Sequence, residues 1–154
     1  MVAEGSPAPD FELQSDTGET VRLSSLGGKL VVLYFYPKDH TSGCTTQACG
    51  LRDAWSEFER AGAVVLGVSP DDVASHESFR ADYELPFTLL ADPEHEVAEA
   101  YGVWGEKSRD GRTYMGINRS TFVIGPDGVI QKVMHDVEPA THAEDVLAVL
   151  RAAA

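Results

Sequence analysis

The chain is short of several features that other classes of protein need. It has two cysteines, 12 basic residues against 25 acidic ones, and no apolar run long enough to span a bilayer, which takes about 18 residues. Its formal net charge of −13 at pH 7 would repel nucleic-acid phosphates and anionic membrane surfaces. We therefore expect no nucleic acid and no membrane among its partners, and a small, weakly charged substrate.

The first seven residues also show neither the basic segment nor the apolar stretch of a secretion signal. This predicts a cytoplasmic protein, and in the cytoplasm thioredoxin and glutathione keep thiols reduced. Cys44 and Cys49, which are five positions apart, are therefore expected to serve catalysis or to bind a metal, and not to form a permanent disulfide.

Length and apolar pattern predict one α/β domain over residues 1–154. A chain of 154 residues with 43% hydrophobic residues is long enough to bury a core of its own. Residues 30–36 are an unbroken apolar run, typical of a central strand buried on both faces. Apolar residues at three- and four-residue steps predict a helix over 44–61. The other expected elements are a strand at 63–68, a helix from 70 to 83, a strand near 88–90, a helical stretch around 94–101, a hairpin of 121–124 and 129–134, and a last helix after 141.

This order of elements predicts a thioredoxin-like fold, with a central mixed β-sheet flanked by helices. In such a sheet the loop after the first central strand presents its chemistry at the amino end of a helix, and Cys44 lies there. Helix amino ends carry about half a positive charge and unpaired N–H groups, so they favour thiolate over thiol. The polar neighbours at 41–43 and 45–46 favour a reactive Cys44 over a buried structural cysteine.

The spacing of the two cysteines predicts two conformations. Residues five apart on an ideal helix have Cα atoms about 8.7 Å apart, whereas a disulfide needs roughly 4.4–6.8 Å. A bond between Cys44 and Cys49 therefore requires the first turn or more of the helix to unwind. That requirement fits a transient catalytic step.

Residues 37–44, Pro-Lys-Asp-His-Thr-Ser-Gly-Cys, match the Pro-x-x-x-Thr-x-x-Cys signature of the peroxiredoxins, thiol peroxidases built on an elaborated thioredoxin fold. Segments 43–49, 51–53 and 101–108 resemble those of the bacterioferritin comigratory protein or peroxiredoxin Q subfamily. The resemblance covers nearly the whole chain. It extends through 114–124, the region that supplies the family's second-motif arginine.

The resemblance implies a site and a reaction cycle. Cys44 would be the peroxidatic cysteine and Cys49 the resolving cysteine. The residues that bind and organise the peroxide would be Pro37, Thr41, Gly43 and Arg119. The implied enzyme is an atypical two-cysteine peroxidase, which reduces hydrogen peroxide and organic hydroperoxides through a sulfenic acid and an intramolecular disulfide.

Thioredoxin or a similar dithiol is the implied reductant of that disulfide. No cofactor and no metal is implied. Relatives of this subfamily are often monomers, so we expect a monomer. Many members carry an acidic residue where this chain has Gln47.

Two other classes remain open from the residues alone. A thioredoxin-fold disulfide reductase would normally carry Cys-x-x-Cys, and the four intervening residues of this chain count against it. A copper-binding module on the same fold would use both cysteines and a distant histidine such as His135 as ligands.

Several candidate residues also have a structural alternative. Thr41 is as well suited to capping a helix as to binding peroxide. Pro37 is as well suited to ending a strand as to shielding the site. We expect Tyr101 and Trp104 in the core, and residues 106–107 as a solvated pair in a loop.

Overall fold

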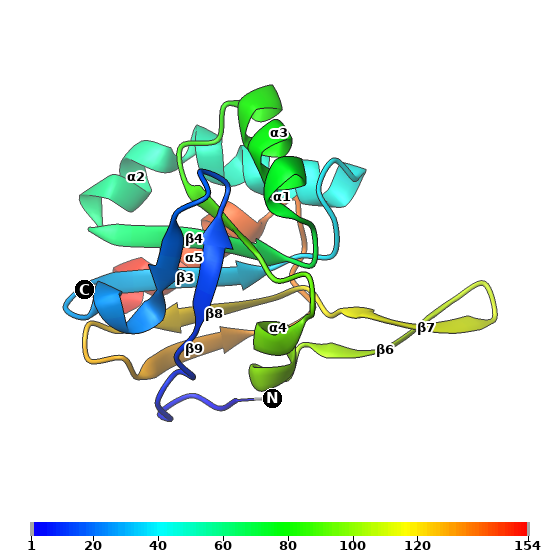
Figure 1. The fold of residues 1–154 in the computed structure, drawn as a ribbon. Helices are drawn as coiled ribbons and strands as arrows, with labels where there is room; N and C mark the ends of the chain where they lie inside the picture. Colours follow the sequence, from blue (N-terminus) through cyan, green and yellow to red (C-terminus); the bar gives the residue numbers. More distant parts are fainter. Residues whose placement is uncertain (1, 154) are drawn as a thin grey trace.

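The protein folds around a seven-stranded sheet with helices on both faces (Figure 1). The computed structural model describes residues 2–153. The strands are β1 (Glu12–Ser15), β2 (Thr20–Arg22), β3 (Leu30–Phe35), β4 (Ala63–Ser69), β5 (Thr88–Ala91), β6 (Trp104–Arg109), β7 (Arg112–Ile117), β8 (Ser120–Ile124) and β9 (Ile130–Met134). The helices are the 3₁₀ helix η1 (Leu23–Leu26), α1 (Ser42–Asp53), α2 (Trp55–Arg60), α3 (Val73–Tyr83), α4 (Glu96–Ala100) and α5 (His142–Ala153).

The order of strands in the sheet is β2-β1-β5-β4-β3-β8-β9. β3, β4 and β5 run parallel, whereas β8 and β9 on one side and β1 and β2 on the other join antiparallel. Val32 of β3 lies between Val65 of β4 and Val123 of β8. The predicted central mixed sheet flanked by helices is confirmed, and so is the predicted hairpin, which is β8 and β9.

Alternate residues of β3 enter two hydrophobic clusters on opposite faces of the sheet. Val32 and Tyr34 pack with side chains from α1, α2, α3 and α5. Val31 and Leu33 pack with side chains from α4 and the N-terminal segment. This is the arrangement expected of a strand that is covered on both faces, and the chain leaves β3 toward the loop that carries Cys44.

The helix predicted over 44–61 is two helices, α1 and α2, which meet at Ala54. This residue has φ −99° and ψ 13°, so it departs from helical geometry. Trp55 and Phe58 of α2 still pack into the same cluster as α1. The spacing of apolar residues therefore continues across the break, and a periodic pattern cannot reveal one non-helical residue.

α3 begins at Val73, later than its sequence pattern predicts. Asp72 is its N-cap residue, because the carboxylate accepts a hydrogen bond of 2.8 Å from the Ser75 amide. Ser69 instead donates its hydroxyl hydrogen to Asp71. None of the helices in residues 2–153 has the length and apolar character needed to cross a membrane.

Four strands, β1, β2, β6 and β7, have no counterpart in the sequence-based prediction. β1 and β2 are short and largely exposed, so they contain no apolar run. β6 and β7 form a separate hairpin that projects from the body of the molecule (Figure 1). Its turn is Asp110-Gly111, with φ of 52° and 76°. An Asp-Gly pair is a strong hairpin signal because both residues of the turn need a positive φ, so this hairpin could have been found from the sequence.

Candidate active site

Cys44 lies in the first turn of α1, after the loop that follows β3. Thr41 is the N-cap residue of this helix, and the first intrahelical bond runs from the Thr45 amide to the Thr41 carbonyl at 2.9 Å. The amides of residues 42–44 therefore have no acceptor within the helix. Cys44 is 1% exposed, so its thiol is held at the positive end of a helix and away from bulk water.

Arg119 brings a positive charge to this thiol. It lies in the link between β7 and β8, and its Nη1 is 3.4 Å from the Cys44 sulfur and 2.6 Å from Oε1 of Gln47. Ser120, the next residue, pairs with Phe35 at the end of β3. Arg119 and the loop that carries Cys44 are therefore placed at the same end of the sheet by strand pairing.

Gly43 and Thr41 lie beside the same thiol. A Cβ atom on Gly43 would be 3.2 Å from Nη2 of Arg119, so glycine leaves room for the guanidinium. The Thr41 hydroxyl donates to the Lys38 carbonyl at 2.7 Å and makes no capping bond to α1. Thr41 therefore occupies the N-cap position without a capping bond from its side chain, and the hydroxyl oxygen keeps its lone pairs for an incoming donor.

Cys49 lies on the same helix, is half-buried, and carries a free thiol like Cys44. α1 is continuous from Ser42 to Asp53. Ideal helix geometry keeps the two Cα atoms about 8.7 Å apart, beyond the reach of a disulfide. A bond between these cysteines therefore requires α1 to open.

A groove of about 480 Å³ lies between this loop and the β6–β7 hairpin. The side next to Cys44 is formed by Pro37, Thr41, Gly43 and Arg119. The hairpin contributes large apolar side chains, Trp104, Tyr114 and Met115. Tyr114 and Met115 are 45% and 54% exposed, which is unusual for side chains of this size and leaves an apolar wall open to a ligand.

Gln47 connects Arg119 to a buried histidine that no sequence pattern singles out. Gln47, His142 and Thr121 are each 0% exposed. Nε2 of Gln47 lies 3.2 Å from Nδ1 of His142, and Nε2 of His142 lies 2.8 Å from Oγ1 of Thr121. Burial lowers the pKa of His142 from 6.5 to about 4; Asp145 opposes this shift and Arg119 adds to it. The imidazole is therefore neutral at pH 7.

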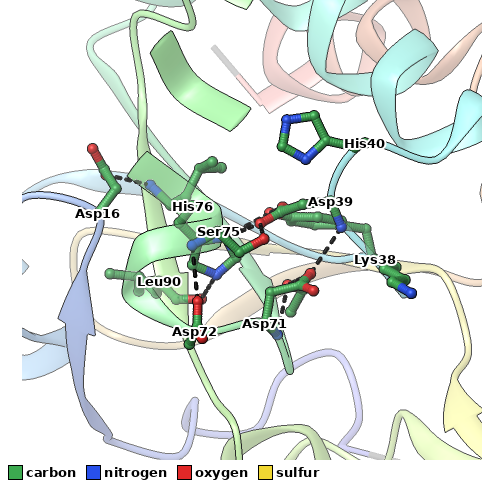
Figure 2. Close-up of polar contacts among 12 residues, drawn as sticks. Asp16, Lys38, Asp39, His40, Asp71, Asp72, Ser75, His76 and Leu90 are labelled. Atoms are coloured by element: carbon green, nitrogen blue, oxygen red, sulfur yellow. Dashed lines mark hydrogen bonds and ion pairs between the residues drawn. The ribbon is translucent and has the colours of Figure 1, made fainter. Parts of the chain in front are cut away.

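A second buried network fixes the loop between β3 and α1, and Figure 2 shows its polar contacts. Asp39 is 4% exposed, and its Oδ1 accepts a hydrogen bond of 2.6 Å from the Tyr36 hydroxyl. Its Oδ2 lies 2.9 Å from Oγ of Ser75 and 2.6 Å from Nδ1 of His76. Nε2 of His76 lies 2.9 Å from the Leu90 carbonyl. These contacts tie the loop to α3 and β5.

The directions of these hydrogen bonds follow from the partners. A carbonyl can only accept, so Nε2 of His76 carries a hydrogen, and one further proton lies between Nδ1 and Asp39. The histidine and the carboxyl group together therefore carry no net charge. Burial raises the pKa of Tyr36 well above its usual range, and the neighbouring Tyr34 and Asp39 add to the shift, so its hydroxyl keeps the hydrogen that it donates.

Asp39, Asp71 and His76 offer ligand atoms within 4.8 Å of one another, the only such group of three found among residues 2–153. These atoms already have protein partners, because Asp71 accepts from the Asp39 amide and from the Ser69 hydroxyl. The group is satisfied without a metal ion. The copper-binding alternative needs the two cysteines together with His135, and the described residues form no such group.

The prediction that residues 106–107 are a solvated pair in a loop is wrong for Lys107. It is a half-buried residue of β6 that donates to the Ile117 carbonyl at 2.8 Å, and not part of a solvated loop pair. Burial lowers the pKa of its ammonium group, and the charge of Arg119 lowers it further, while Cys44 opposes the shift. Tyr101 is fully buried, as predicted. Trp104 is half-buried and lines the groove, so it is only partly a core residue.

A sheet of this topology, with a buried thiol at a helix amino end and an arginine against its sulfur, defines the class of thioredoxin-like thiol enzymes. Comparison with known proteins gives the family. Residues 5–133 match the AhpC/TSA family. The chain is 51% identical over 143 residues to the putative peroxiredoxin bcp of Coxiella burnetii, covering 93% of this chain and 95% of the relative. It is 49% identical over 147 residues to peroxiredoxin Bcp of Bacillus subtilis, covering 96% and 94%.

Solved structures agree with the sequence comparison. A cysteine-to-serine variant of PrxQ from Xylella fastidiosa superposes with a TM-score of 0.93 at 35% identity, covering 99% of this chain and 98% of the other. The bacterioferritin comigratory protein of Xanthomonas campestris, described for its alkyl peroxide reduction activity, gives 0.88 at 38% identity, covering 93% and 91%. The chain belongs to the AhpC/TSA family, and it is a thiol-dependent peroxidase with the thioredoxin-like peroxiredoxin fold. These sequence-based predictions are confirmed, and the disulfide-reductase alternative is wrong.

Proposed function

We propose that Cys44 is the residue that attacks the peroxide and that Arg119 stabilises the charge that develops in the reaction. The observation that carries this assignment is the contact of 3.4 Å between Nη1 of Arg119 and the Cys44 sulfur. The free amides of residues 42–44 supply further donors, and the Thr41 hydroxyl, whose hydrogen goes to the Lys38 carbonyl, accepts a hydrogen bond from the peroxide. Pro37 and Gly43 shape the entrance from the groove.

The chemical step needs these donors. The Cys44 thiolate attacks one peroxide oxygen, the S–O bond forms and the O–O bond breaks, and the leaving oxygen takes a proton to become water or an alcohol. Negative charge moves from sulfur to the leaving oxygen. Each donor aimed at developing charge contributes about 3–4 kcal/mol, so the arginine and the amides supply most of the rate acceleration.

Cys49 then resolves the sulfenic acid. Its sulfur attacks the Cys44 sulfur, the hydroxyl group leaves as water, and an intramolecular disulfide forms. α1 must open for this step because both cysteines lie on it. The oxidised protein therefore has a different conformation around residues 42–53.

A dithiol protein returns the enzyme to its reduced form, and thioredoxin is the reductant that we propose. Two electrons and two protons pass to the disulfide through a mixed disulfide. Both cysteines lie within one chain and the site uses no residue from a second copy, so we propose a monomer that acts as one domain over 1–154. A cytoplasmic location supplies the reductant, and the chain needs neither a metal nor a cofactor for this cycle.

The groove supports organic hydroperoxides as substrates besides hydrogen peroxide. Its volume of about 480 Å³ far exceeds the roughly 30 Å³ that one water molecule occupies. Tyr114 and Met115 give it an apolar wall, against which an alkyl group loses contact with water. The Xanthomonas relative, described for alkyl peroxide reduction, supports the same substrate class here.

The two cysteine variants test the assignment. Cys44→Ser is expected to abolish peroxide consumption, whereas Cys49→Ser is expected to keep fast oxidation to a sulfenic acid and to form no intramolecular disulfide. Mass spectrometry after one equivalent of hydrogen peroxide reads both outcomes. Equal losses of oxidation rate in the two variants would overturn the roles given to the cysteines.

Substrate choice is tested on the hairpin. Met115→Ser is expected to lower the rate with cumene hydroperoxide severalfold and to leave the rate with hydrogen peroxide unchanged, because only the first substrate buries apolar surface there. Lys132→Ser, an exposed change on β9, is the matched control. Equal effects on both substrates would remove the hairpin from the binding site.

A further inference from the structure

A hydrogen-bonded chain runs from the Cys44 thiol into the core behind Arg119. Nη1 of Arg119 contacts both the Cys44 sulfur and Oε1 of Gln47. Nε2 of Gln47 contacts Nδ1 of His142, and Nε2 of His142 contacts Oγ1 of Thr121. The chain joins α1, the β7–β8 link, α5 and β8, and its last three members are completely buried.

The chemistry of the partners fixes the direction of each bond. A guanidinium can only donate, so the Gln47 carbonyl oxygen must face Arg119, and its NH₂ group must face His142. Nδ1 of His142 therefore accepts and carries no hydrogen. Nε2 carries the hydrogen and donates it to Thr121. Only one form of the imidazole, neutral and protonated on Nε2, satisfies both contacts.

A glutamine side chain does not fix its own orientation. Its two ends have nearly the same size but opposite hydrogen-bonding character. If the amide turned over, its NH₂ group would face Nη1 of Arg119, and two donors would oppose each other at a distance that is now 2.6 Å. Arg119 would then have to move, and with it the contact of 3.4 Å to the Cys44 sulfur.

We propose that His142 is a positioning residue for peroxide reduction: its unprotonated Nδ1 holds the Gln47 amide in the orientation whose carbonyl oxygen keeps Arg119 against Cys44. This rests on the proposed role of Arg119. It also explains how an amide serves at position 47. A carboxylate there accepts from Arg119 whichever way it is turned, whereas an amide needs a partner that selects one orientation.

The surroundings of His142 keep it neutral. Arg119 faces it through Gln47, Asp145 lies one turn further along α5, and the Tyr34 ring is 5.6 Å from its own. Burial lowers its pKa to about 4 against the opposing effect of Asp145. Burial also raises the pKa of Tyr34 well above the usual range, so the phenol carries no charge. The acceptor at Nδ1 is therefore maintained throughout the neutral pH range.

Substitutions at position 142 separate positioning from packing. His142→Asn keeps an acceptor where Nδ1 lies, and His142→Phe keeps a ring without one. We expect the rate constant for oxidation of the reduced protein by hydrogen peroxide to fall at least tenfold in His142→Phe, toward the roughly 100-fold or greater loss of a missing donor. His142→Asn should stay within about threefold of the parent. His135→Phe, an exposed histidine, is the matched control and should be unchanged.

Equal rates in the parent and His142→Phe would overturn the positioning role while leaving the peroxidase assignment intact. A parent protein that reacts no faster than free cysteine would instead overturn the proposed function itself. Equal losses in His142→Phe and His142→Asn would also contradict the proposal, because the acceptor would then not be the feature that matters.

Nitrogen NMR of the histidine rings gives a second test that needs no change at position 142. In the parent protein the His142 ring is expected to be protonated on Nε2 only at pH 7. Gln47→Glu removes the donor that faces Nδ1 and adds a negative charge, so His142 should become protonated on both nitrogens. A hydrogen on Nδ1 in the parent, or an unchanged ring in Gln47→Glu, would overturn the proposal.

Discussion

His76 and His142 are both completely buried, and each supports one side of the site. His76 lies between a carboxyl group and a carbonyl, so both of its nitrogens have acceptor atoms beside them and the network holds an additional proton. His142 lies between an amide and a hydroxyl, and one of its nitrogens must accept. Burial is the same in the two places, so the partners decide the protonation state.

The two regions also differ in what happens to them during the reaction. The members of the His76 network lie in the loop before α1, on α3 and on β5, and none of these contacts involves α1. One of the two partners of His142 is Gln47, which lies between the two cysteines on α1. The opening of α1 that we propose for the disulfide would break the His142 chain, whereas the His76 network could stay intact. In the proposed cycle, one histidine thus supports the fixed part of the site, and the other supports the part that moves.

Removal of Asp39 should give the largest effect on the His76 side. Asp39→Ala leaves His76, Ser75 and Tyr36 buried without their shared acceptor, so the free energy of unfolding should fall by about 3–5 kcal/mol. Urea unfolding measures this change. Asp82→Ala, which removes the partner of the exposed His40, is the control and should cost less than about 1 kcal/mol. An unaltered unfolding midpoint in Asp39→Ala would show that this network does not hold the loop.

The His142 side should differ from the His76 side in how the free energy of unfolding depends on pH. The pKa of His142 is about 4 when folded and 6.5 as a free side chain, so between these values the unfolded chain binds a proton that the native state does not. The contribution of neutral His142 to the free energy of unfolding is therefore fully present above pH 6.5. It is lost as the pH falls toward 4, by about 3 kcal/mol in total.

His142→Asn isolates this contribution because asparagine does not titrate. Between pH 5 and 6 the parent should lose about 1.2 kcal/mol per pH unit more than the variant. Urea unfolding of both proteins at several pH values gives the two slopes. Parallel slopes would mean that His142 does not resist protonation, and the contrast with His76 would fail.

Loss of Arg119 should slow oxidation about tenfold or more. Arg119→Ala removes the group that reaches the Cys44 sulfur and also leaves Gln47 without its donor. Stopped-flow mixing of the reduced variant with hydrogen peroxide measures the rate. Arg22→Ala, which breaks an exposed pair with Glu12, is the control. An unaltered rate would remove Arg119 from the site.

Gly43→Ala should have the smallest effect. The new Cβ would lie 3.2 Å from Nη2 of Arg119, so the guanidinium must shift by a few tenths of an ångström and the oxidation rate should fall severalfold at most. Gly50→Ala, on the same helix, meets only an ordinary contact of 3.8 Å. It should stabilise α1 by about 0.5–1 kcal/mol and leave oxidation unchanged. The reverse order of the two rates would contradict the geometry around Arg119.

The sequence predicts the centre of the molecule better than its edges. Residues 30–36 form an apolar run because β3 is covered on both faces, and this strand, β4 and the amphipathic helices follow from apolar spacing alone. β1 and β2 escape prediction because short, largely exposed strands need no apolar run. The break at Ala54 escapes because the apolar face continues through Trp55 and Phe58.

The residues of the candidate site also fall into two groups, those that the sequence predicts and those that it does not. Cys44, Cys49 and Thr41 are found from a local motif, and Arg119 from a second segment that resembles the family. His142 and His76 cannot be found like this, since their roles arise from contacts between distant elements, and a single buried histidine has no spacing signature. The sequence shows Gln47 only as an amide where many relatives have an acidic residue. The structure shows that this amide contacts His142.

Stopped-flow tryptophan fluorescence of the reduced protein mixed with hydrogen peroxide, followed by a count of free thiols, tests directly whether Cys44 and Arg119 are assembled for peroxide reduction. Trp104 lines the groove and gives a signal close to the reaction. We expect oxidation at least roughly a thousandfold faster than that of free cysteine under the same conditions, with both thiols lost for each peroxide consumed. A rate like that of free cysteine would contradict this expectation, because Cys44 and Arg119 would then not be assembled for peroxide.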